Sequence, residues 1–495
     1  MKNTLLFLII ALIFNACTST SKFYSYEETQ SLIDEKFQDS LFAHAHWGVL
    51  IQSLDDDQIW YQQNADKMFM PASNEKIPTS AAALITLGPD FMFESGLYYK
   101  GEIEDSVLKG DLIVKGNGDP TFYTRFFDDS RTPFFNWADT LLQIGITKIE
   151  GNIIGDDNAF DDYGYGMGWT HSGLDSWYSA ESGALQFNEN YVDLYIVQPA
   201  TVQDSVEIIP NVPSSYFSII NKTTATDSGR TRISVNRPFG TNDLIISGLV
   251  HIGNDTLERS PSIFNPTLFY TTVLKETLQD KGILVSGKAL DCDDIEGFEA
   301  DSTQLQLLAI HKSPPLKEIL KGLMKRSQNM YAETMVKTMG WQQSGLGSFG
   351  NGKEVVEKVL EDFGIEPKTY AYRDGSGLSR YNFISPRQIV KILKGMRNSQ
   401  HWETWKEIQP IAGVDGTLKR RMRGTKAEGN VRAKTGTISN VRGLSGYVTT
   451  DAGEEIVFSF LINGHLRSSR ETELITDKVL DLIAEYPKKA ILENK

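Results

Sequence analysis

The stretch PASNEKIPTSAAALITL, residues 71–87, places Ser73 three residues before Lys76 at the start of a predicted helix. Residues three apart share one face of a helix, so the lysine amine lies within reach of the serine hydroxyl. The rest of the helix is rich in alanine and almost free of charge, and Pro78 falls near the first turn, where proline is tolerated. We therefore expect a buried helix with a reactive polar pair at its start.

Ser73 and Lys76 are the two kinds of side chain, a nucleophile and a base, that an activated serine requires. A serine hydroxyl is a poor nucleophile at neutral pH and needs a nearby base. Lys76 is a base only when it is neutral, and burial together with a second cation, Lys434, is expected to lower its pKa. For an isolated Ser-x-x-Lys match, solvated helix surface is the simpler interpretation, but the apolar helix that follows argues against it here.

A second motif, Ser327-Gln328-Asn329, follows along the chain. Ser327 is placed to relay a proton to a leaving amine, and Asn329 to hold a substrate amide and to orient Lys76. If this motif stood alone, we would interpret Ser327 as a helix cap.

The third motif is Lys434-Thr435-Gly436. Lys434 and Thr435 are predicted to bind a terminal carboxylate of the substrate, and Gly436 to let the substrate approach the strand. The backbone N–H groups of Ser73 and Thr437 would form an oxyanion hole. The three motifs together predict acyl transfer on a peptide that ends in a free carboxylate.

The predicted elements describe one domain interrupted by a long insert. Residues 26–95 and 288–495 would form the catalytic domain, and residues 96–287, where short strand-like runs alternate with turns, a β-rich insert of two nested domains. We expect helices at 26–42, 73–87, 266–281, 316–340 and 471–486, and strands at 47–53, 58–62, 444–449 and 455–462.

The N-terminus predicts export. Residues 1–16 combine Lys2 with an apolar run too short to span a bilayer permanently, and Cys17 follows, which predicts a lipoprotein signal peptide, lipidation of Cys17 and a tether over 17–25. An ordinary secretory signal is the alternative. We therefore predict a periplasmic protein anchored by lipid to a bacterial membrane, and we favour the outer membrane. The second cysteine, Cys292, is left without a disulfide partner.

Composition excludes several other classes. A formal net charge of −15 repels phosphate backbones, so we expect no nucleic-acid partner. The seven histidines lack metal-ligand spacing, and we expect neither a metal nor a cofactor.

The chain resembles the class C low-molecular-mass penicillin-binding proteins, the D-alanyl-D-alanine carboxypeptidase/endopeptidase family. The resemblance rests on a set of short segments: PASNEK (71–76), GNGDPT (116–121), DGSGLSR (374–380), AGVDGTL (412–418), AKTGT (433–437) and LSGYV (444–448). It implies an α+β transpeptidase-like domain of the penicillin-binding and serine β-lactamase type, with two nested β-rich domains. It also implies that Ser73 forms an acyl-enzyme with peptidoglycan stem peptides and with β-lactams.

The resemblance further implies a pocket for the diaminopimelate side chain of the stem peptide. By motif position, Arg380 and Ser439 belong to it, with Asp175 as a third member. Asp175 follows from the segment GWTHSGLD (168–175), which departs from the family's tryptophan- and aspartate-rich pattern. Arginine is a good carboxylate ligand, and aspartate pairs with an ammonium group.

Two other functions compete with a serine DD-peptidase. A serine β-lactamase shares the three motifs, but the long insert and the lack of an evident carboxylate to activate a deacylating water argue against it. A non-catalytic wall-binding lipoprotein has no need for Ser73 and Lys76 together. Turnover of penicillin separates the first alternative from a peptidase, and covalent labelling by penicillin tests the second.

Overall fold

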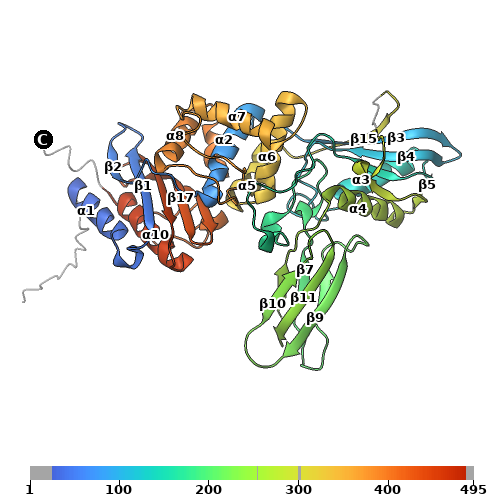
Figure 1. The fold of residues 1–495 in the computed structure, drawn as a ribbon, viewed down its shortest axis with the longest axis horizontal. Helices are drawn as coiled ribbons and strands as arrows, with labels where there is room; N and C mark the ends of the chain where they lie inside the picture. Colours follow the sequence, from blue (N-terminus) through green and yellow to red (C-terminus); the bar gives the residue numbers. More distant parts are fainter. Residues whose placement is uncertain (1–24, 254, 299–302, 487–495) are drawn as a thin grey trace, which may run out of the picture.

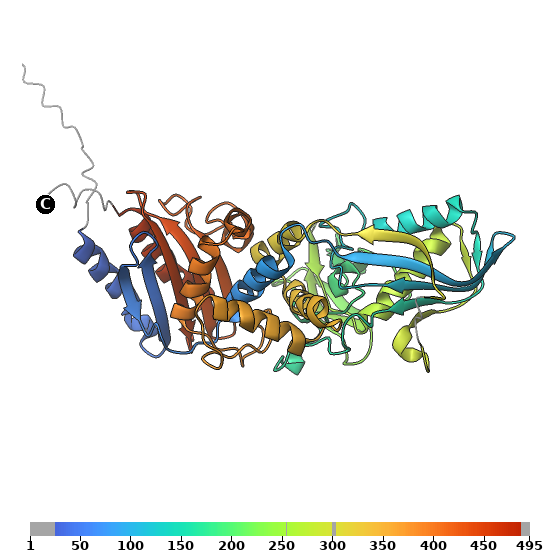
Figure 2. The same ribbon diagram turned by 90° about the horizontal axis from the view of Figure 1, so that it is seen from above.

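The computed structural model describes residues 25–253, 255–298 and 303–486. The molecule is elongated, with both ends of the chain in one half and the insert in the other (Figures 1 and 2). The expected signal peptide, Cys17 and most of the tether lie outside the described residues. In the described part, no helix is long and apolar enough to cross a membrane.

An antiparallel sheet of five strands joins the two ends of the chain, in the order β16-β17-β18-β1-β2. Its members are β1 (His46–Ser53), β2 (Ile59–Gln63), β16 (Arg432–Ile438), β17 (Val441–Thr449) and β18 (Glu455–Asn463). The helices α1 (Tyr26–Phe37) and α10 (Ser469–Ala484) pack on one face, in a core that contains Phe37, Phe460 and Val479. The strands and terminal helices predicted from the sequence are therefore present, although the first helix ends at Phe37 and a 3₁₀ turn follows.

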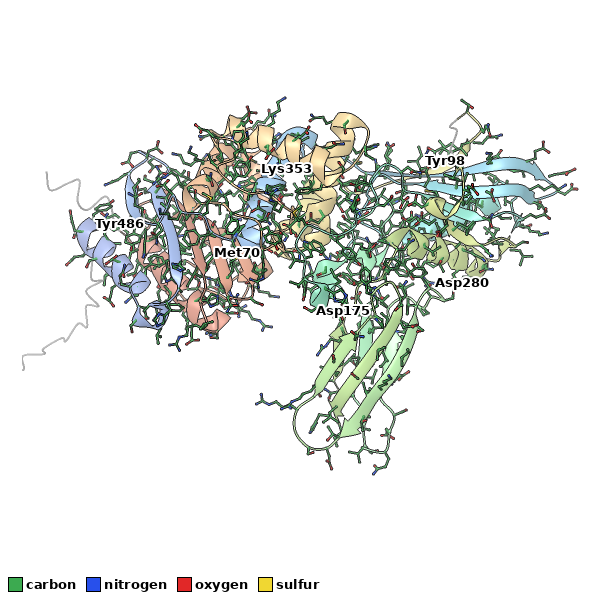
Figure 3. All side chains as sticks on the ribbon, viewed as in Figure 1. Met70, Tyr98, Asp175, Asp280, Lys353 and Tyr486 are labelled. Atoms are coloured by element: carbon green, nitrogen blue, oxygen red, sulfur yellow. The ribbon has the colours of Figure 1, made fainter. Side chains whose placement is uncertain are left out.

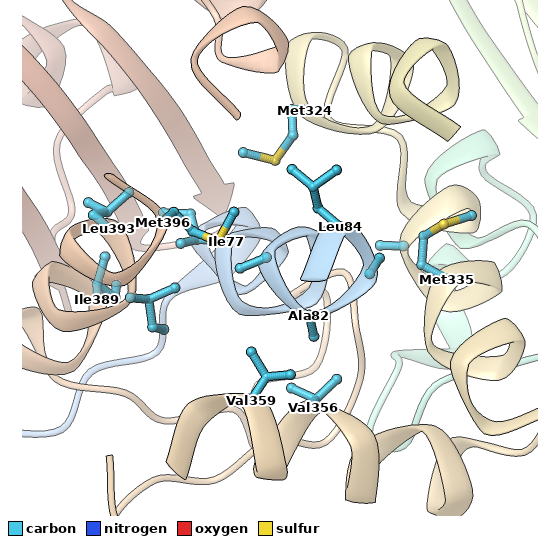
Figure 4. Close-up of a cluster of buried hydrophobic side chains, with 14 of the residues drawn as sticks. Ile77, Ala82, Leu84, Met324, Met335, Val356, Val359, Ile389, Leu393 and Met396 are labelled. Atoms are coloured by element: carbon cyan, nitrogen blue, oxygen red, sulfur yellow. The ribbon is translucent and has the colours of Figure 1, made fainter. Parts of the chain in front are cut away.

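The predicted buried helix is α2 (Lys76–Leu87), preceded by a 3₁₀ turn over Ala72–Glu75. Every residue from Lys76 to Leu84 is buried. Figure 4 shows α2 surrounded by apolar side chains of four helices, among them Met324, Met335, Val356 and Leu393. These helices are α5 (Leu316–Lys325), α6 (Asn329–Ser344), α7 (Phe349–Asp362) and α8 (Pro386–Arg397), and α9 (Trp402–Ile408) packs against α5 and α8. The start of α2 is thereby fixed by its core.

The single helix predicted at 316–340 is wrong, because the chain breaks between α5 and α6. Ser327 has a φ of 63°, in the left-handed region that a non-glycine residue seldom adopts. Ser327 is not the cap of α6 either, since the N-cap position is Gln328, without a side-chain capping bond. Apolar periodicity continues across the break, which is why the sequence pattern concealed it.

The insert contains a seven-stranded mixed sheet backed by two helices. Figure 1 shows α3 (Thr132–Gln143) and α4 (Pro266–Asp280) on one face of it. The strands are β3 (Glu94–Glu104), β4 (Val107–Lys115), β5 (Lys148–Ile149), β6 (Ile153–Asp156), β13 (Leu284–Val285), β14 (Ala289–Asp291) and β15 (Gln306–Lys312). We did not expect α3, although Phe134, Trp137, Ala138 and Leu141 have helical spacing and are buried.

Strand pairing places the end of the insert later in the chain than we expected. We expected the catalytic domain to resume at residue 288, but β14 pairs with β6 and β15 pairs with β3. The strands β14 and β15, the latter ending at Lys312, thus belong by hydrogen bonding to the insert sheet, and Cys292 is buried there as a free thiol. The sequence did not predict this boundary, because β14 has only three residues and the partners of both strands lie far away in the chain.

A smaller lobe extends from the insert (Figure 1). It contains two three-stranded sheets, in the orders β12-β7-β8 and β10-β11-β9. The strands are β7 (Leu194–Val197), β8 (Glu207–Pro210), β9 (Ser218–Thr226), β10 (Arg232–Asn236), β11 (Asp243–His251) and β12 (Thr256–Arg259). Leu194, Ile196, Leu244 and Ile246 belong to the same buried cluster as α3 and α4, so the lobe and the larger sheet share one core.

Candidate active site

Ser73 lies in the 3₁₀ turn that leads into α2, at the edge of a cavity. The turn packs tightly against the loop that follows Asp374. A Cβ atom at Gly377 would lie 1.8 Å from the carbonyl oxygen of Ala72, and Gly377 itself has a φ of +83°. Only glycine fits at this position, so the backbone of this loop approaches the nucleophile turn directly.

Lys76 is buried beneath Ser73. Its Nζ atom lies 3.0 Å from Ser73 Oγ, 2.6 Å from Asn329 Oδ1 and 2.7 Å from the carbonyl oxygen of Ser376. The last two atoms are acceptors only. A neutral amine has two N–H groups and one lone pair, so donation to Asn329 and Ser376 leaves the lone pair for the hydroxyl hydrogen of Ser73. The surroundings of Lys76 therefore suit a general base.

Burial lowers the pKa of Lys76 to about 7, while the nearby carboxyl groups of Asp374, Glu333 and Glu75 oppose this shift. We expected Lys434 to be the second cause. Instead, repulsion between the two amines affects Lys434, whose pKa is lowered well below its ordinary value by burial and then by the charge of Lys76. A substantial fraction of Lys76 is thus neutral at neutral pH.

Two buried carboxyl groups shape the loop around Ser376. Glu333 accepts hydrogen bonds from the backbone N–H groups of Gly375 and Ser376, both at 2.9 Å. Asp374 accepts from the N–H of Gly377 at 2.8 Å, among other donors. Burial raises the pKa of Glu333 to about 7. The sequence predicts no role for Glu333 or Ser376, and DGSGLSR is informative there only as part of the family resemblance.

The second motif faces Lys76 and the third motif. Asn329 Nδ2 donates to the carbonyl oxygen of Tyr178 at 2.7 Å, while its Oδ1 accepts from Lys76. Lys434 Nζ donates to Ser327 Oγ at 2.8 Å. The left-handed backbone at Ser327 thus directs its hydroxyl toward Lys434, and the three motifs meet in one hydrogen-bonded group.

The third motif lies on β16, the edge strand of the five-stranded sheet. Thr435 Oγ1 donates to Thr417 Oγ1 at 2.8 Å, and Asn74 Nδ2 donates to the carbonyl oxygen of Lys434 at 3.3 Å. A Cβ atom at Gly436 would lie 2.6 Å from the carbonyl oxygen of Pro71. Gly436 therefore allows the nucleophile turn to pack against the strand, and this contact explains the glycine without the substrate approach that we expected.

Residues of all three motifs line a cavity of about 820 Å³, whereas Lys76 and Lys434 are buried behind its wall. Its walls include Ser73, Ser327, Asn329, Thr435, Thr437, Ser439, Arg326, Arg380 and Arg442. None of the lining residues in the described part of the chain is Asp or Glu, although the whole protein is strongly acidic. A cavity lined by arginines and hydroxyl groups is suited to bind a carboxylate.

The expected pocket residues fall into two groups. Arg380 and Ser439 both line the cavity, and Arg380 Nη2 donates to the carbonyl oxygen of Ser439 at 3.2 Å. Asp175 is not among the lining residues. Its carbonyl oxygen accepts from Ser262 N at 3.0 Å, and Figure 3 shows it where the lobe joins the body of the molecule. Ser172 of the same segment and Tyr178, three residues beyond Asp175, do line the cavity.

The comparisons with known proteins agree with this geometry. Residues 29–485 match the model of the D-Ala-D-Ala carboxypeptidase 3 (S13) family. The chain belongs to this family. It is 31% identical to a D-alanyl-D-alanine carboxypeptidase of an Actinomadura species, over 93% of this chain and 85% of that protein. Membership confirms a serine peptidase, as the sequence predicted.

Solved structures with a similar fold come from the same group of enzymes. The crystal structure of penicillin-binding protein 4 from Haemophilus influenzae has a TM-score of 0.78 and 26% identity, and the match covers 92% of this chain and 99% of that one. A second structure of that protein, in complex with a β-lactam, has a TM-score of 0.71 and 26% identity, over 91% and 98% of the two chains. The expected penicillin-binding fold with inserted domains is thereby confirmed.

Proposed function

We propose that this protein cleaves the terminal D-Ala-D-Ala bond of peptidoglycan stem peptides through an acyl-enzyme on Ser73, and that β-lactams acylate the same serine. The observation that carries the proposal is the position of Lys76 Nζ. It lies 3.0 Å from Ser73 Oγ, and two pure acceptors occupy its N–H groups. Family membership supports the substrate class.

Acylation follows from this arrangement. Lys76 removes the proton of Ser73 as Oγ attacks the penultimate D-alanine carbonyl, and the backbone N–H groups of Ser73 and Thr437 stabilise the oxyanion. The C–N bond then breaks, and the leaving D-alanine takes a proton from Ser327, which is hydrogen-bonded to Lys434. The proton that Lys76 removed returns to Ser327, so Lys76 is neutral again. Water, activated by Lys76, hydrolyses the ester and restores Ser73.

Binding of the terminal carboxylate involves Lys434 and Thr435. Lys434 is buried with a lowered pKa, and the negative charge of an arriving carboxylate favours its protonated form. Arg380 and Ser439 line the same cavity and would bind an acidic terminus on the side chain of the stem peptide. Asp175 has no part in this proposal.

A serine β-lactamase is the competing function. Rapid hydrolysis of a penicilloyl ester is assisted by a carboxylate beside the deacylating water, and no Asp or Glu lines the cavity in the described part of the chain. We therefore expect release of D-alanine from an acetylated tripeptide that ends in D-Ala-D-Ala, and slow turnover of penicillin. Rapid penicillin turnover without D-alanine release would favour the β-lactamase.

The location of the enzyme is also a proposal. The short apolar run and Cys17 support a lipid anchor and a periplasmic position, and the net charge of −15 supports the absence of a nucleic-acid partner. The described fold begins with α1 at Tyr26, so a tether over 17–25 would connect it to the membrane.

A further inference from the structure

A buried carboxylate of the insert lies directly behind the second motif. The Glu189 side chain has no exposed surface and is not among the residues that line the cavity. It forms a bidentate ion pair with Arg125, from Nε at 2.6 Å and Nη2 at 3.0 Å, and accepts from the hydroxyl of Tyr191 at 2.5 Å. Its two remaining donors come from the catalytic domain: the side-chain amide of Gln328 and the hydroxyl of Tyr331, the latter at 2.6 Å.

Gln328 and Tyr331 flank the residues that act in the cavity. Gln328 stands between Ser327 and Asn329 and is only 1% exposed, and Tyr331 lies in the first turn of α6. The start of α6 has no side-chain capping bond, and Ser327 before it has a left-handed backbone. Local sequence therefore does little to hold this segment, and the contacts with Glu189 supply the constraint.

The backbone that presents Glu189 is itself unusual. Asn188, Glu189 and Asn190 have φ values of 53°, 52° and 55°, three consecutive residues in the left-handed region. Asparagine tolerates this conformation, but glutamate gains nothing from it locally. Side-chain bonds hold the turn, since Asn188 Nδ2 donates to Tyr191 O and Asn190 Nδ2 donates to Glu181 O, both at 2.8 Å. A left-handed backbone that is stabilised by several side-chain hydrogen bonds is typical of a functional position.

We propose that Glu189, held by Arg125, is a positioning residue for the reaction: it fixes Ser327 and Asn329 by binding Gln328 and Tyr331. The inference rests on the proposed roles of Ser327 and Asn329. It gives the insert a part in catalysis, because the acceptor that holds the second motif belongs to the insert. Loss of this acceptor would leave the Arg125 charge and two buried donors unpaired.

Two variants test the link. Glu189→Gln keeps the size of the side chain but turns a donor toward groups that are themselves donors. Gln328→Met removes the contact from the other side and leaves Glu189 paired with Arg125. Each should lower the rate constant for acylation by benzylpenicillin at least tenfold. Each should also shift the acid limb of its pH profile, because Asn329 Oδ1 is a direct partner of Lys76.

Asp161→Asn is the matched control. It removes the ion pair between the insert and Lys337 of α6, 2.8 Å long and about two helical turns from Asn329. This variant should lower the melting temperature but keep the wild-type acylation rate and pH profile.

The measurements are made where circular dichroism shows each protein folded. If Glu189→Gln does not fold, the acylation rate constant and pH profile of Gln328→Met test the inference. Wild-type rates and pH profiles in the folded variants, or an equal loss in Asp161→Asn, would overturn the inference. A wild-type protein that penicillin does not acylate would instead refute the proposed function.

Discussion

Acidification should inactivate Ser73 by protonating Lys76 rather than by unfolding the protein. The pKa of Lys76 is about 7 because the amine is buried, and only the neutral amine accepts the serine proton. About nine-tenths of Lys76 is neutral at about pH 8, about one-tenth at about pH 6 and about one-hundredth at about pH 5. The rate constant for acylation by a reporter penicillin should therefore fall roughly 90-fold from about pH 8 to about pH 5.

The assay is stopped-flow acylation with a fluorescent penicillin, with tryptophan fluorescence followed to verify folding at each pH. Glu333→Gln provides a second test, because the Glu333 charge raises the pKa of Lys76. The pKa of Glu333 is itself about 7, so part of this charge is already neutralised in the acid limb, and its removal should move the limb toward lower pH by less than removal of a permanent charge would. A rate constant that stays flat from about pH 8 to about pH 5 in folded protein would refute Lys76 as the base, and an acid limb shifted upward in Glu333→Gln would refute the electrostatic explanation.

Three other predictions concern single residues. Arg380→Ala should lower kcat/KM about tenfold to more than a hundredfold on a diaminopimelate-containing peptide, because a guanidinium–carboxylate contact contributes about 1.5–3 kcal/mol. On a peptide without that carboxylate terminus, kcat/KM should change little. Equal losses on the two peptides would exclude Arg380 from substrate selection. Gly436→Ala should lower the free energy of unfolding by about 1–3 kcal/mol in urea, because its Cβ would meet the carbonyl oxygen of Pro71 at 2.6 Å, and an unchanged midpoint would contradict the packing role. Cys17→Ser should abolish lipid attachment, seen by intact mass and detergent partitioning, and identical behaviour of the two proteins would mean an ordinary secreted enzyme.

The sequence was a good guide to the site where the chemistry depends on adjacent residues. Ser73 and Lys76 meet because they lie on consecutive turns of one short segment. Ser327 and Lys434 were both predicted to belong to the site, but the hydrogen bond between them was not predicted, because no local rule places these residues together.

The remaining features depend on long-range packing. The carbonyl oxygen of Ser376 reaches Lys76 only because Glu333, on another helix, holds the loop. The left-handed backbone of Ser327 interrupts a continuous apolar pattern, and β15 joins the insert sheet across more than two hundred residues of chain. Asp175 is a further case: Ser172 of its segment lines the cavity and Asp175 does not, and sequence spacing alone does not separate them because a 3₁₀ turn lies on each side of Asp175.

The central claim is that Ser73 is the nucleophile. Intact-mass spectrometry after incubation with benzylpenicillin tests it most directly. We predict one covalent adduct of the mass of the antibiotic, located by peptide mapping on Ser73 and absent from Ser73→Ala, while Ser327→Ala still forms it more slowly. An adduct that persists in folded Ser73→Ala protein would contradict the account.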